Sequence, residues 1–62
     1  MKTENLTQAC HSFEFFIRDL RGAHTDAVNS KDGFAEMALL DLIEDAAKLR
    51  TKVERIKAVA GV

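Results

Sequence analysis

Two ladders of apolar residues, separated by one turn-like cluster, constrain the fold of this chain more than any other feature. In both ladders an apolar residue recurs at alternating spacings of three and four. The first ladder consists of Leu6, Ala9, Phe13, Phe16, Leu20, Ala23 and Ala27, and the second of Ala35, Leu39, Leu42, Ala46, Leu49, Val53, Ile56 and Ala60. This spacing predicts two helices, each with one buried stripe.

We therefore expect a single all-α domain over residues 1–62, folded as an antiparallel two-helix hairpin. The first helix is expected at about residues 4–28, the turn at about 29–33 and the second helix at about 34–60. No proline interrupts either helix. The first helix is expected to start near Thr3 or Asn5, where Asn5 and Gln8 have the spacing of a capping box. Asn29, Ser30 and Asp32 are all suitable N-caps for the second helix.

The small size of the chain indicates self-association. A single core at this size supplies about 3–5 kcal/mol, so small folds usually need an additional stabilising element. Cys10 has no second cysteine to pair with, and together with His11 and His24 it does not make a structural zinc set. Pairing of two hairpins would close the core, so we expect a homodimeric four-helix bundle.

The second helix is more apolar than a two-helix hairpin requires. Met37, Leu40, Ile43 and Ala47 lie beside its ladder and widen the apolar arc, which predicts that residues 37–47 lie at the centre of the dimer. The expected dimer interface comprises Phe13, Phe16, Leu20, Met37, Leu39, Leu40, Leu42, Ile43, Ala46, Ala47, Leu49 and Val53. The topology of the dimer stays open, as does a heterologous partner for the wide arc.

Phe15 is the best candidate for a contact with another protein. It lies roughly opposite the stripe of the first helix at about 100° per residue, and His11, Arg18 and Gly22 share that outer side. An aromatic residue with arginine in reach is typical of a binding hot spot. The alternatives are that Phe15 packs in the dimer or is an isolated exposed side chain, and that Gly22 is a tolerated surface glycine.

We expect no catalytic, cofactor or metal site, and hence no enzyme. On a helix the side chains of Cys10 and His11 diverge by about 100°, so they do not form a dyad. His24 is expected to be a half-buried, satisfied structural histidine. The acidic residues of the second helix lie on a face away from its ladder, where solvation accounts for them.

Charge and hydropathy argue against nucleic acid and membranes as partners, and a lone Cys10 fits a reducing compartment, so we expect a cytoplasmic protein. The net charge is −1, no apolar run approaches the roughly 18 residues of a membrane span, and the polar first five residues do not resemble a signal peptide. In the second helix, acids fill the first half and bases the second, which complements the helix dipole. A basic end that docks an acidic partner is the alternative.

These features predict a small homodimeric protein-interaction module, such as a regulator or inhibitor of the phage or plasmid type. As an alternative, the chain resembles the Rop family of plasmid copy-number regulators in size, in its two helices with one turn and in the expected four-helix dimer. That resemblance implies RNA binding by polar and basic residues of the first helices with an aromatic, here Arg18, Arg21 and Phe15. A structural subunit of a larger complex is the third possibility.

Overall fold

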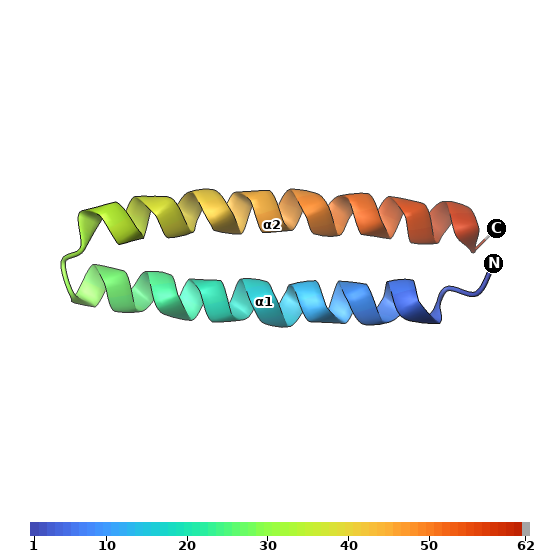
Figure 1. Cartoon of the computed structure of the whole chain (residues 1–62), viewed down its shortest axis with the longest axis horizontal. Helices are drawn as coiled ribbons and strands as arrows, with labels where there is room; N and C mark the ends of the chain where they lie inside the picture. The colour runs from blue at the N-terminus through green and yellow to red at the C-terminus, as the bar shows by residue number, and fades with distance from the viewer. Residues whose placement is uncertain (62) are drawn as a thin grey trace.

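The protein is a long helical hairpin. The computed structural model describes residues 1–61, in which α1 spans Glu4–Asn29 and α2 spans Gly33–Ala60. The two helices run antiparallel along a rod 47 Å long, and both termini lie at the end opposite the turn (Figure 1). The expected helical hairpin is confirmed. We refer below to the turn end and the terminal end of the rod.

The helix ends differ in how their backbone groups are satisfied. The carbonyl of Thr3 accepts from the amide of Thr7 at 2.9 Å and from its hydroxyl at 3.0 Å, while no side chain caps α1. Of the two expected starts, Thr3 is the N-cap, and Asn5 lies inside the first helical turn, so Asn5 and Gln8 do not form a capping box. At α2, Asp32 is the N-cap, and its Oδ1 accepts from the amide of Ala35 at 3.1 Å.

The core is a narrow seam between the two helices. In the described residues, Ile17 and Leu20 of α1 form a buried cluster with Ala46 of α2, and Leu39 and Ile43 pack against it. Ala27 of α1 is buried nearer the turn. One side of each stripe stays accessible in a single hairpin, as expected for two helices alone: Phe16, Leu42, Leu49 and Ile56 are 43–54% exposed. A helix with one neighbour covers only part of a stripe this wide.

Candidate interaction surfaces

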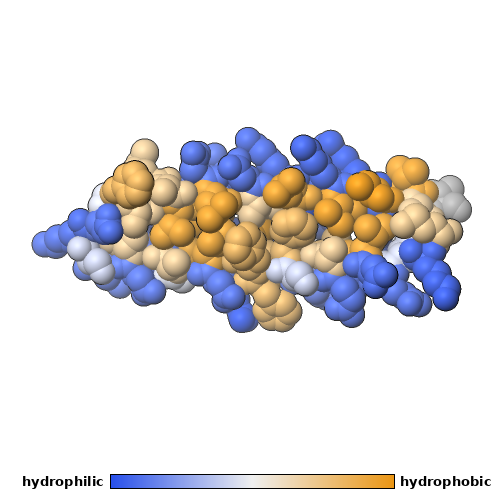
Figure 2. All heavy atoms as spheres, viewed as in Figure 1, coloured by the Kyte–Doolittle hydropathy of each residue, from blue (hydrophilic) through white to orange (hydrophobic). Residues whose placement is uncertain are grey.

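One side of the hairpin is apolar along most of its length. On this side of the seam, the helix positions next to the buried ones recur every seven residues. We call this side the apolar face, and it consists of Ala9, Phe16 and Ala23 from α1 and Leu42, Leu49 and Ile56 from α2. Figure 2 shows a continuous apolar band over both helices. The half-exposed residues of the ladders are therefore gathered on one surface.

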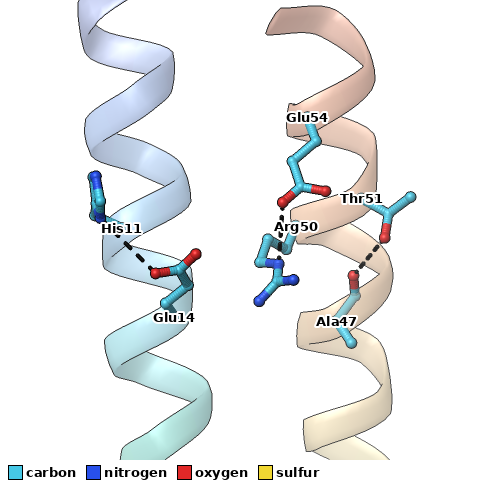
Figure 3. A network of polar contacts seen from close by, with 6 residues as sticks. All are labelled: His11, Glu14, Ala47, Arg50, Thr51 and Glu54. Atoms are coloured by element: carbon cyan, nitrogen blue, oxygen red, sulfur yellow. Dashed lines mark hydrogen bonds and ion pairs between the residues drawn. The ribbon is translucent and has the colours of Figure 1, made fainter. Parts of the chain in front are cut away.

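The opposite side of the seam is a polar groove. It is lined by Glu14, Ile17, Arg18, Arg21, Ala47, Arg50 and Thr51. The Nε of Arg50 lies 3.3 Å from an Oε of Glu54, and Figure 3 shows the Arg50 side chain turned toward α1. This groove brings together arginines of both helices. The position of Arg50 in this groove was not predicted, because a surface charge in a helix gives no signal of what lies across from it.

The outer side of α1 carries an exposed aromatic with an arginine over it. The Phe15 side chain is 56% exposed, and the guanidinium carbon of Arg18 lies 5.1 Å from the centroid of its ring. His11, one turn away, has its Nδ1 3.9 Å from an Oε of Glu14 (Figure 3). Nothing lies within 4 Å of a Cβ placed on Gly22, so packing within the chain does not require a glycine there. The predicted partner-binding residues therefore share one open surface.

The predicted dimer-interface residues fall into three groups. Leu20 and Ala46 are buried inside the hairpin, with Phe13, Leu39, Ile43 and Val53 half-buried along the same seam. Phe16, Leu42 and Leu49 lie on the apolar face, whereas Met37, Leu40 and Ala47 point to other sides of α2. One partner on the apolar face cannot cover all of residues 37–47. Ile56, a ladder position left out of the predicted interface, belongs to that face.

Cys10 and His24, the two residues considered above for side-chain chemistry, are both half-buried. Cys10 is half-buried and free. His24 is half-buried in the seam, and its Nε2 is buried with no hydrogen-bond partner in the described residues. The half-buried position is as expected, whereas the mostly apolar side chains around the seam offer Nε2 no hydrogen-bond partner.

Comparisons of this chain with protein-family models, curated proteins and solved structures give no match. In the described residues, no group of three or more His, Cys, Asp or Glu side chains is placed to hold a metal ion. Neither helix combines the length and apolarity that crossing a bilayer requires.

Proposed function

We propose that this protein is a non-enzymatic, homodimeric interaction module that regulates or inhibits a protein partner. The observation that carries the proposal is uncovered apolar surface on two separate sides of the hairpin. The apolar face suits a second copy, which would complete a four-helix bundle. The surface around Phe15 suits a different protein.

The exposed area of one hairpin supports self-association. A compact monomer of 6.9 kDa exposes about 4,000 Å², whereas the hairpin exposes 4839 Å². The excess of about 800 Å² is close to the roughly 800 Å² that each partner buries in a protein interface of standard size. Covering the apolar face would remove surface of about this extent from water.

Phe15 supports a contact with a second protein. A large aromatic side chain that is already held against Arg18 loses little conformational freedom when a partner covers it. Aromatic and arginine side chains together are typical of the few residues that dominate an interface. A module of this kind acts by covering a surface of its target and needs no chemistry of its own.

The experiment is affinity purification of the tagged full-length chain from its native host, with sedimentation to verify the dimer. The variant is Phe15→Ala, and the matched control is Phe34→Ala, which removes an aromatic that is 86% exposed at the start of α2. We expect a stoichiometric partner to be retained by the wild type and the control and lost by Phe15→Ala. Retention by Phe15→Ala would remove this residue from the site.

RNA binding is the second candidate, supported by the polar groove. Three guanidinium groups, those of Arg18, Arg21 and Arg50, line it beside Phe15 on the outer side. Phosphate binding needs a local positive excess, and Glu14 and Glu54 reduce that excess here. A gel-shift assay with structured RNA at low salt tests this candidate, and an absence of retardation would reject it.

A further inference from the structure

The two ends of the hairpin carry opposite charge. The turn half, residues 17–46, holds seven acidic and three basic side chains, a formal charge of −4. The terminal half, which consists of residues 1–16 and 47–62, holds six basic and three acidic side chains, a formal charge of +3. This asymmetry lies on α2, whose residues 33–46 carry a formal charge of −4 and residues 47–60 one of +4. The electrostatic energy of two such rods therefore depends on the direction in which they pack.

Two arrangements bring the same face of two identical hairpins together with two-fold symmetry. If the axis runs along the rod, the turns share one end, and α1 of one copy packs on α2 of the other. If the axis runs across the rod, the turns lie at opposite ends, and each helix packs antiparallel on its own counterpart.

We propose that two copies pair through the apolar face with their turns at opposite ends, so that α2 lies antiparallel to α2 of the second copy. This inference rests on the proposed homodimer and specifies its partner surface and direction. In this arrangement the acidic half of each copy faces the basic half of the other. In the alternative, the two acidic halves share one end of the bundle and the two basic halves share the other. Each α2 then packs on α1, which lacks this asymmetry, and not on the oppositely charged half of a second α2.

The charged residues that border the apolar face favour the same direction. Asp45 and Lys52 each follow an apolar-face residue of α2 by three positions, which puts them at its edge. The midpoint of α2 lies between residues 46 and 47. In an antiparallel pair about this midpoint, Asp45 lies level with Lys48 of the second copy and within about one helical turn of its Lys52. Symmetry forms each such contact twice.

The opposite choice juxtaposes like charges at the same edge. Ile17 and Ala46 belong to one buried cluster, so Asp19 of α1 lies level with residue 44 of α2. With the turns at one end, α1 packs on α2 of the second copy, and Asp19 then lies beside Asp45 of that copy. Carboxylates facing each other across an interface weaken it.

A distance measurement between two turns tests the direction. The variant is Ser30→Cys in a Cys10→Ala background, spin-labelled at the exposed turn residue and measured by pulsed dipolar spectroscopy under conditions where sedimentation shows a dimer. We expect a label-to-label distance close to the 47 Å length of the rod. If the turns share one end, the distance is much shorter, because packed helix axes lie roughly 10 Å apart and only the length of the labels is added. That result would overturn the proposed direction but not the dimer. A wild-type chain that stays monomeric would overturn both.

A charge reversal that needs no label gives a second test. With the turns at opposite ends, Asp45→Lys places lysine against lysine and raises the dimer dissociation constant roughly 3- to 10-fold. The double variant Asp45→Lys, Lys48→Asp restores the opposite pairing across the interface and recovers most of the affinity. If the turns share one end, Asp45→Lys relieves the contact with Asp19 and tightens the dimer, which would overturn the proposal.

Discussion

The amide of Asp32 donates a hydrogen bond to the carbonyl of Ala27 at 3.0 Å, across the end of α1. A second bond runs from the amide of Lys31 to the carbonyl of Val28 at 3.1 Å. Together these two bonds form a Schellman motif, which closes a helix when the residue after the C-cap adopts the left-handed conformation. That residue is Lys31, with φ of 55°, at a position where glycine is usual.

We expect Lys31→Gly to raise the free energy of unfolding by about 0.5–1 kcal/mol. A side chain in the left-handed region crowds the following carbonyl, and glycine removes that crowding. The matched control is Ser30→Gly, since Ser30 has φ of −86° and gains nothing from glycine. Urea denaturation at one fixed protein concentration measures both. A loss of stability in Lys31→Gly would contradict the strain that we assign to this residue.

Removing the N-cap of α2 is expected to lower the free energy of unfolding by about 1 kcal/mol. The variant is Asp32→Ala, which leaves the amide of Ala35 without the carboxylate that accepts from it. Asp41→Ala, an exposed acidic position inside α2, controls for the loss of one negative charge. Thermal unfolding followed by circular dichroism compares the two. Equal melting temperatures for the two variants would show that the cap contributes no more than its charge.

The ladders were sufficient to predict the hairpin, but not which side chains it buries. Alternating spacings of three and four place a stripe on one side of a helix, and in a four-helix bundle two neighbours share that stripe. The pattern therefore does not separate Leu20, which faces the other helix, from Phe16, which does not. Ile17 and Ile43 lie outside the ladders and still pack in the core, because the seam lies to one side of the stripe.

The candidate partner surface was predictable because it depends only on helical geometry. Phe15 and Arg18 are three residues apart, so any helix through them brings the two side chains together. The polar groove was not predictable, because Arg50 reaches it from a helix whose rotation about its axis the sequence does not specify. The missing hydrogen-bond partner of His24 depends in the same way on what α2 places opposite it.

Replacing His24 by leucine is expected to raise the free energy of unfolding by about 1 kcal/mol. A buried polar atom without a partner destabilises a fold by about 1–3 kcal/mol, and an apolar side chain of similar size removes that penalty. The matched control is His11→Leu on the exposed outer side of α1, where we expect a change within about 0.5 kcal/mol. Denaturant titration of both variants gives the comparison. A less stable His24→Leu would mean that water or a second copy satisfies Nε2.

Two polar substitutions, on different sides of α2, test whether the apolar face is the dimer interface. Leu49 lies on the apolar face and Met37 does not, although both side chains are exposed in the single hairpin, at 49% and 70%. Burying a leucine contributes about 1.5–3 kcal/mol, and a two-fold interface contains each position twice. Because only about half of Leu49 is left to bury in the dimer, we expect Leu49→Gln to weaken the dimer by about 1.5–3 kcal/mol and Met37→Gln to leave it unchanged.

Sedimentation equilibrium over a range of concentrations measures both dissociation constants. Because folding of so small a chain is coupled to its association, the melting temperature of the wild type should also rise with concentration. Leu49→Gln should reduce this dependence, because its monomer no longer gains a partner over the measured range. If Met37→Gln disrupted the dimer as strongly as Leu49→Gln, the interface would extend round α2 beyond the apolar face, as the wide apolar arc of residues 37–47 predicts.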